Sequence, residues 1–199
     1  MRIFEGKRHM SVIRVFSPLA ACVAMTLMAP GPFGSVTPGS LEAQEVATPA
    51  ADPADVASQD AIIAAVYDVI SGPAGQARDW DRFRSLFLPE ARLVAVRVSG
   101  EGEVSTVVMT PDEYAERSGA PLMANGFFEV EIHRVGEEYG HIAHLFSTYE
   151  SRRSADDPEP FARGINSFQL MWDGERWWVL TIFWDSERAG QPIPAKYGG

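Results

Sequence analysis

Apolar residues recur at helical spacing in two segments of the first half of the chain. After Ser58, a typical N-cap residue, apolar side chains fall three and four positions apart as far as Ile70. Asp79 can cap a second segment with the same spacing, and Pro89 is expected to end it. The pattern therefore predicts two successive helices before residue 90.

A third helix is expected between two stretches of β pattern. Thr110 followed by Pro111 and Glu113 has the sequence of a capping box with proline in the first turn. On its N-terminal side, Arg92–Val98 and Ser105–Thr110 are rich in β-branched residues and flank a turn that contains glycine. These two stretches predict a β-hairpin that leads into the third helix.

Four longer strands follow in the second half of the chain. Their alternating segments are Gly126–Gly136, Gly140–Arg152, Phe161–Trp172 and Glu175–Glu187. Helices that precede a run of antiparallel strands are typical of an α+β fold. We therefore expect one curved, antiparallel mixed sheet that wraps around three helices from the N-terminal half.

The last two strands can be aligned by the turn between them. A two-residue turn at Asp173–Gly174 pairs Gln169 with Trp178 and Arg163 with Trp184, on one sheet face. The opposite face then carries Asn166, Phe168, Leu170, Trp177, Val179, Thr181 and Phe183. Because both faces are apolar and the helices can cover only one, we expect a homodimer through the outer face of the sheet. The alternative is that the ends of the chain cover this face.

The face that carries Trp184 is the expected wall of a pocket. Arg163 meets Glu150 there if the preceding hairpin pairs these two residues. Thr148 and His144 share the face of Glu150, because residues two apart in a strand point the same way. Aromatic walls with a few polar groups are typical of a small-molecule site, so these five residues are ligand-binding candidates.

Tyr67, on the first helix, is the sixth candidate and could donate a hydrogen bond to the ligand, with His144 or Glu150 as general base. The alternative is an ordinary cross-strand ion pair beside a core histidine. Tyr149 is expected on the other face, at the surface or in the dimer. His141 and His144 are three apart in a strand and point to opposite faces, so we expect no metal site.

The order of elements resembles the nuclear transport factor 2-like superfamily, which includes ketosteroid isomerase, scytalone dehydratase and polyketide cyclases of the SnoaL type. The resemblance covers Ser58 to Glu187. It is carried by "SLFLPEARLVAV", Ser85–Val96, and by "RGINSFQLMWDGERWWVLTIFW", Arg163–Trp184. The sequence is most similar to secreted bacterial members without an assigned activity. The resemblance implies a cone that opens between sheet and helices, and pairing through the outer sheet face in many members.

The superfamily includes isomerases, dehydratases, cyclases, hydrolases and binding modules, so the resemblance implies no single activity. Tyr67 matches the first-helix tyrosine of ketosteroid isomerase, but Arg92–Val98 lacks the carboxylate of its base. We therefore favour a module that binds a small apolar molecule or a partner. The alternative is a cofactor-independent lyase or isomerase that uses acid–base catalysis in the cone. A third interpretation is an assembly factor without an open pocket.

Composition narrows these choices. The formal net charge is −10, whereas a nucleic-acid surface needs a basic footprint. Beyond residue 43, Lys196 is the sole lysine and no cysteine remains. This argues against Schiff-base chemistry and excludes thiol catalysis in that part of the chain. We expect no cofactor.

The N-terminal region has the pattern of an export signal. A basic stretch precedes Val15–Ala29, a run of 15 uncharged residues that is too short for a stable membrane span. We expect a signal peptide over residues 1–43 and export to the periplasm or medium; a lipoprotein anchor at Cys22 is the less favoured alternative. A flexible leader (44–57), the folded domain (58–188) and an extended tail (189–199) complete the expected organisation.

Overall fold

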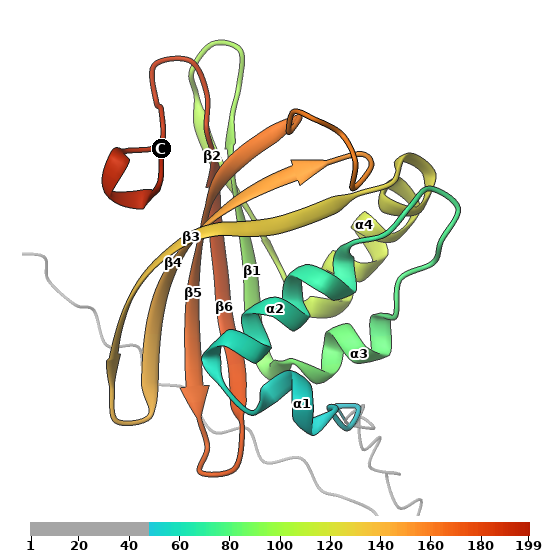
Figure 1. Ribbon diagram of the computed structural model, residues 1–199, viewed down its shortest axis with the longest axis vertical. Helices are drawn as coiled ribbons and strands as arrows, with labels where there is room; N and C mark the ends of the chain where they lie inside the picture. Colours follow the sequence, from blue (N-terminus) through green and yellow to red (C-terminus); the bar gives the residue numbers. More distant parts are fainter. Residues whose placement is uncertain (1–47) are drawn as a thin grey trace, which may run out of the picture. The chain divides into compact units, whose positions relative to one another are not determined.

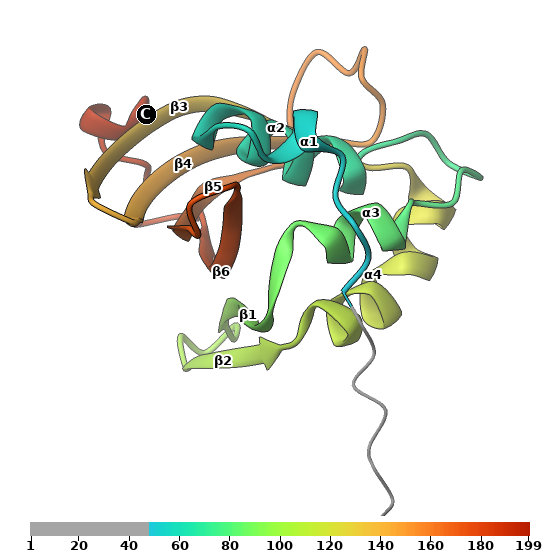
Figure 2. The ribbon, with the colours of Figure 1, turned by 90° about the horizontal axis from the view of Figure 1, so that it is seen from below.

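A computed structural model describes residues 48–199, and it has the predicted α+β fold. One curved six-stranded sheet has helices against one face, as Figures 1 and 2 show. The predicted signal peptide, with Cys22, and the first four residues of the predicted leader lie outside the described residues.

The elements follow one another in the predicted order. The helices are α1 Pro53–Val56, α2 Gln59–Ile70, α3 Trp80–Ser85 and α4 Pro111–Asn125, with a 3-10 turn, η1, at Ala195–Tyr197. The strands are β1 Phe87–Val98, β2 Val104–Met109, β3 Phe128–Tyr139, β4 Ile142–Arg152, β5 Ala162–Trp172 and β6 Trp177–Ser186. Within residues 48–199, no helix has the length and hydrophobicity needed to cross a membrane.

The three predicted helix starts are confirmed by their hydrogen bonds. Ser58 caps α2 by accepting a hydrogen bond from the backbone nitrogen of Ala61 at 3.1 Å. Asp79 caps α3 in the same way. Thr110 and Glu113 form the reciprocal capping box of α4. Side-chain oxygens thus satisfy backbone donors that a helix leaves free in its first turn.

Two local features differ from the prediction. The short helix α1 lies inside the segment expected to be a flexible leader, and its Val56 is buried against the core. Pro89 does not end α3, which stops at Ser85, but lies inside β1. It is tolerated there because β1 pairs with β6 at Phe87 and again only from Arg92 onward, so Pro89 interrupts no ladder.

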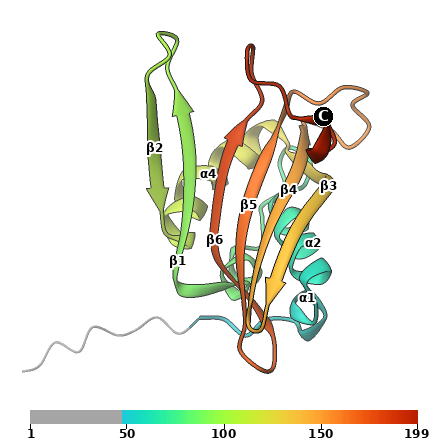
Figure 3. The same ribbon diagram turned by 90° about the vertical axis from the view of Figure 1, so that its left-hand side faces the viewer.

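The sheet order is β2-β1-β6-β5-β4-β3, and the pair β1–β6 is parallel while all other pairs are antiparallel. Figure 3 shows the β1–β2 hairpin diverging from β6 toward one end. The divergence follows from the register, since β1 pairs with β6 only as far as Ala95 opposite Trp184. The sheet is therefore open at that end.

The predicted register of β5 and β6 is wrong. The turn has four residues, because Asp173 accepts hydrogen bonds from the backbone nitrogens of Glu175 and Arg176, both at 2.8 Å. Leu180 is then an extra residue in β6, since Val179 and Thr181 pair with consecutive residues of β5. Such a bulge exchanges the two faces of the strand beyond it.

The bulge decides where Trp184 lies. Trp184 pairs with Asn166 rather than Arg163, and Ile182 pairs with Phe168. Trp184, Asn166, Ile182 and Phe168 therefore point to the face that the helices cover. Thr181 and Phe183 point to the outer face. They are thus separated from Asn166, Phe168, Leu170, Trp177 and Val179, with which they were predicted to share a face.

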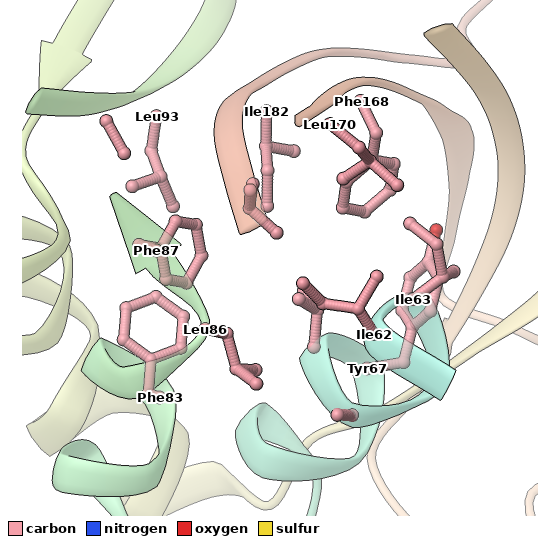
Figure 4. Packing of buried hydrophobic residues seen from close by; sticks show 14 of the residues in the cluster. Ile62, Ile63, Tyr67, Phe83, Leu86, Phe87, Leu93, Phe168, Leu170 and Ile182 are labelled. Atoms are coloured by element: carbon pink, nitrogen blue, oxygen red, sulfur yellow. The ribbon is translucent and has the colours of Figure 1, made fainter. Parts of the chain in front are cut away.

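The core fills the space between the sheet and α2 and α3. In Figure 4, Ile62 and Ile63 of α2 face Phe168 and Leu170 of β5. On the other side of the view, Phe83, Leu86 and Phe87 pack below Leu93 and Ile182. The buried residues labelled there are Ile62, Ile63, Tyr67, Phe83, Leu86, Phe87, Leu93, Phe168, Leu170 and Ile182. This core holds α2 and α3 at a fixed distance from the strands.

The C-terminal residues lie on the outer face of the sheet, away from the helices (Figures 1 and 3). The buried Thr148 hydroxyl donates a hydrogen bond to the backbone oxygen of Tyr197 at 2.7 Å. The Tyr197 ring lies against Phe146, with centroids 5.4 Å apart, and Ile193 is buried. The tail thus covers part of the outer face, as one of the two sequence interpretations proposed.

Candidate functional site

A cavity of about 330 Å³ lies between the helices and the inner face of the sheet. This volume is at the small end of the range of ligand pockets, about 300–1,000 Å³. Aliphatic side chains from the helix and the sheet form part of its wall: Val66, Ile70, Leu93 and Ile182. The cavity therefore begins where the close-packed core ends.

Aromatic side chains form most of the remaining wall. Three are tyrosines from three different elements: Tyr67 on α2, Tyr114 on α4 and Tyr149 on β4. The others are Phe83, Phe127, Phe161, Phe168 and Trp184. The rings of Tyr114 and Trp184 meet edge to face, with centroids 6.4 Å apart. A small apolar ligand would contact ring surface on several sides.

Glu129, near the start of β3, is the acidic residue of this cavity. Ser151 donates a hydrogen bond to its Oε2 at 2.8 Å, and the amide of Asn166 lies 3.4 Å from its Oε1. Burial raises the pKa of the Glu129 carboxyl to about 7, although both hydrogen bonds act in the opposite direction. Glu129 can therefore gain or lose a proton near neutral pH.

A chain of hydrogen bonds runs from Asn166 through Tyr67 and Ser147 to Glu131. Asn166 donates to the Tyr67 hydroxyl at 3.0 Å, and Ser147 donates to Oε1 of Glu131 at 2.6 Å. The hydroxyls of Tyr67 and Ser147 are 2.7 Å apart. Because the single Ser147 proton goes to Glu131, Tyr67 must donate to Ser147. The Tyr67 proton therefore points away from the cavity in this arrangement.

The far end of this chain is fixed by an ion pair. Arg134 donates to both carboxylate oxygens of Glu131, at 2.7 and 2.5 Å, and reaches Asp60 of α2 at 2.6 Å. Such a two-pronged pair fixes orientation as well as charge. Glu131 is therefore already partnered, which separates its role from that of Glu129 two residues earlier.

The three cavity tyrosines are held protonated at neutral pH. Burial is the main cause that raises the pKa of Tyr67 and of Tyr114 well above the ordinary value, and the Glu129 charge adds to it. Burial also raises the pKa of Tyr149 to about 12, with a smaller contribution from Glu129. All three phenols line the same cavity as the Glu129 carboxylate.

Of the six residues predicted from the sequence, the structure places Tyr67 and Trp184 on the cavity. The other four, His144, Thr148, Glu150 and Arg163, lie on the opposite face of the sheet. They follow the alternation of β4 and β5, in which Leu145, Ser147 and Tyr149 point inward. The predicted cluster is thus divided between two faces, because the bulge at Leu180 carried Trp184 to the inner one.

The predicted pairing of Glu150 with Arg163 is confirmed. The two residues are opposite each other in β4 and β5, and Arg163 Nε lies 3.4 Å from Glu150 Oε1. Arg152 also contacts Glu150, at 2.7 Å, and Arg163 contacts Glu187, at 3.2 Å. These charges form a partly buried network on the outer face.

His144 is also on the outer face, exposed, with its Nε2 3.0 Å from the Ser167 hydroxyl. His141 has Nδ1 2.8 Å from the backbone oxygen of Trp172. Within residues 48–199, no group of three or more histidine, aspartate or glutamate side chains is arranged to hold a metal ion.

A second depression, of about 310 Å³, lies on the outer face under the C-terminal tail. Phe146, Ile165, Phe183 and Ile193 form part of its wall. Trp184 borders this groove as well as the interior cavity. This residue therefore lies between the two spaces, near the point where β1 leaves β6.

Sequence reasoning missed Glu129, Tyr114 and the inward orientation of Tyr149 and Asn166. The β3 segment alternates acidic and apolar residues, but it is the acidic Glu129 and Glu131 that face the helix side. The apolar partners Val130 and Ile132 are 48% and 41% exposed. The signal that could have identified the inward side of β3 is the presence of polar partners for its glutamates, Ser147, Ser151 and Asn166, on β4 and β5. Using it requires the register between β3 and β4, which the sequence did not provide.

Comparisons with known proteins concern the fold alone. No family model matches the chain, and no curated protein matches it either. A protein of unknown function with a cystatin-like fold from Nostoc punctiforme has a TM-score of 0.48 and 11% identity, covering 64% of this chain and 87% of that one. An NTF-2 like protein of unknown function from Silicibacter pomeroyi has a TM-score of 0.44 and 15% identity, covering 66% and 94%.

A putative ketosteroid isomerase from Shewanella frigidimarina is also similar, with a TM-score of 0.37 and 15% identity over 54% of this chain and 81% of that one. Structures described as NTF-2 like or as a putative ketosteroid isomerase are thus among those similar to this chain. At such identities and TM-scores the likeness carries nothing about activity.

Proposed function

We propose that the interior cavity binds a small, largely apolar molecule. The observation that carries this proposal is a cavity wall of aromatic and aliphatic side chains in which two polar groups, Glu129 and Asn166, lie together. A pocket of this kind takes an apolar body and orients it by a few polar contacts. The fold alone supports many functions, and it is the chemistry of this cavity that favours binding of an apolar molecule.

Native mass spectrometry of the protein purified from the cells that produce it tests the proposal. We expect a bound small molecule, and Ala162→Phe should eliminate it by placing a ring in the cavity. Ala155→Phe, at an exposed loop position, is the matched control and should retain the ligand. An empty wild-type protein that also fails to bind small alkylbenzenes would contradict the proposal.

A second candidate function is cofactor-independent acid–base catalysis by a lyase or isomerase. It is favoured by Glu129, whose pKa of about 7 suits a general base at neutral pH. In this scheme Glu129 accepts a proton from a carbon next to a carbonyl group, and an inward-turned phenol of Tyr67 stabilises the enolate. Asn166 keeps both groups in place through its amide.

Hydrogen–deuterium exchange of cyclohexanone in D₂O, followed by NMR, tests this candidate. We expect the protein to accelerate exchange at the carbons beside the carbonyl, and Glu129→Gln to abolish the acceleration. Exchange at the uncatalysed rate in wild-type protein that demonstrably binds the ketone would rule out Glu129 as its base.

We also propose that the chain forms a homodimer through the outer face of the sheet. Leu180, at the bulge, and Phe183, in the wall of the groove under the tail, remain 40% and 44% exposed. Exposed apolar side chains of this size favour association. Sedimentation at micromolar concentration should show a dimer, which Phe183→Glu disrupts and Tyr139→Glu, at a hairpin end, does not. A wild-type monomer would contradict it.

The third interpretation of the sequence, an assembly factor, requires an exposed apolar face for a protein partner but no ligand in the cavity.

Export remains a proposal that depends on the N-terminal sequence alone. The basic stretch followed by an uncharged run is typical of a secretory signal. N-terminal sequencing of the protein recovered from its cells should find cleavage near Ala43, and an intact or lipid-modified N-terminus would contradict it.

A further inference from the structure

The carboxylate of Glu129 differs from those of Glu131 and Glu150 in having no cationic partner. Glu131 pairs with Arg134 at 2.5 Å, and Glu150 on the outer face pairs with Arg152 at 2.7 Å. Within residues 48–199, no arginine, lysine or histidine forms an ion pair with Glu129. Its polar neighbours are the neutral Ser151 and Asn166.

An unpaired carboxylate in such a place is unfavourable. A charge removed from water needs either a counter-charge or several strong hydrogen bonds to offset the lost hydration. Glu129 has one hydrogen bond of ordinary length, from Ser151, and a long contact with Asn166. A partner that brings positive charge into the cavity would remove this penalty.

The aromatic wall supplies the second requirement for such a partner. Tyr67, Tyr114 and Tyr149, from three elements, line the same cavity as the Glu129 carboxylate, and Trp184 borders it too. The faces of aromatic rings attract cations, most strongly in desolvated sites, and groups of such rings recognise ammonium ions. A carboxylate within aromatic rings is thus suited to a cationic nitrogen.

The one cationic residue of the cavity wall does not fill this role. Arg97 is exposed, on the part of β1 that diverges from β6. It makes no ion pair with Glu129, and its charge is not among the causes that set the pKa of the Glu129 carboxyl. The position beside the carboxylate is therefore left for a ligand.

We propose that the ligand of this cavity carries a positively charged nitrogen, as a protonated amine or a quaternary ammonium group. This nitrogen pairs with Glu129 in the space that the three cavity tyrosines line. The inference depends on the proposed function of the cavity and specifies the chemical class of its ligand. The apolar body of the ligand occupies the space along Phe168 and Ile182.

Binding of this kind is coupled to the proton of Glu129. With a pKa of about 7, the carboxyl is partly protonated at neutral pH, and a cation favours the ionised form. The groups that face Glu129 are Tyr67 of α2, Tyr114 of α4 and Tyr149 of β4, all held protonated, and neutral Ser151 and Asn166. Affinity for a permanently charged cation should therefore rise as pH increases through about 7.

Calorimetric titration with two probes of equal shape tests the inference. Phenyltrimethylammonium carries a permanent charge, and tert-butylbenzene is its neutral counterpart. At about pH 8, the wild-type protein should bind the cation at least tenfold more tightly, and Glu129→Gln should weaken cation binding about 30-fold, the effect of removing one partner of a buried charge pair. Glu137→Gln, an exposed glutamate on the same strand, should leave the preference unchanged.

The outcomes separate this inference from the proposed function. If tert-butylbenzene binds as tightly as the cation, or Glu129→Gln retains the preference, the cationic ligand class is overturned while the cavity remains a binding site. If neither probe binds, the cavity proposal fails as well. Should Glu129→Gln fail to fold, the wild-type protein alone decides: cation affinity must rise roughly tenfold or more between about pH 5.5 and 8.5, and a flat profile overturns the inference.

Discussion

Asn166 Nδ2 donates a hydrogen bond to the Tyr67 hydroxyl at 3.0 Å, joining β5 to α2 across the top of the core. Both side chains are buried, so neither group has water as a substitute partner. Asn166 is also the residue that links Tyr67 to Glu129. This contact therefore couples the helix position to the polar end of the cavity.

Replacing Tyr67 by phenylalanine should lower the free energy of unfolding by about 1–2 kcal/mol. The variant loses the hydroxyl that bonds both Ser147 and Asn166, while the ring and its edge-to-face contact with Phe168 remain. Urea unfolding of Tyr67→Phe, Asn166→Leu and the double variant gives the coupling between the two groups. We expect roughly 1 kcal/mol of coupling; strictly additive losses would show that the hydrogen bond contributes nothing.

The pH dependence of stability should carry the signature of Glu129. Its pKa is raised from 4.5 to about 7 on folding, so between these values the folded state binds more protons than the unfolded state. The Glu129 contribution is therefore complete below about pH 4.5 and is lost as pH rises through about 7. Relative to Glu129→Gln, the wild-type protein should lose roughly 3 kcal/mol over this window.

Chemical unfolding of both proteins at several pH values measures that difference. Subtracting the two curves removes the effect of the other carboxylates, which also titrate at low pH. Glu137→Gln, exposed on the same strand, should run parallel to the wild-type curve. A constant difference between wild type and Glu129→Gln from about pH 4 to 8 would show that the carboxyl titrates normally.

Arg163, a predicted ligand-binding residue, should prove to stabilise the outer face instead. Arg163→Ala removes contacts with Glu150 and Glu187 and leaves both carboxylates near each other. We expect a loss of about 1 kcal/mol in unfolding free energy, typical of a partly exposed ion pair, which decreases at high salt. The affinity of the cavity for tert-butylbenzene should not change; a weaker affinity would return Arg163 to the binding site.

The sequence predicted the fold class and the helix caps because these depend on local patterns. Ser58, Asp79 and Thr110 each act within one helical turn, so their neighbours in the sequence are sufficient to identify them. The Glu150–Arg163 pair was also within reach, since an antiparallel hairpin fixes it.

The site could not be predicted to the same degree, because it depends on two irregularities. The four-residue turn at Asp173 and the extra residue Leu180 each alter the register of β6, and neither leaves a distinct mark in the alternation. A single inserted residue reversed the faces of Trp184 and Phe183. Glu129 was missed for a related reason: a strand whose polar side faces inward has the same alternation as one whose apolar side does.

Trp184 should control how large a ligand the cavity can take. Trp184 borders both the interior cavity and the outer groove, and its indole contacts Tyr114 near the point where β1 separates from β6. Trp184→Ala should join the two spaces and lower the free energy of unfolding by roughly 3 kcal/mol, because the lost ring leaves a void. In titrations with alkylbenzenes of increasing chain length, we expect the wild-type protein to reject long chains that the variant accepts.

Leu180→Ala, at the exposed bulge, is the control and should keep the wild-type length limit. An unchanged limit in Trp184→Ala would show that the indole does not separate the two spaces, and that the wall lies elsewhere.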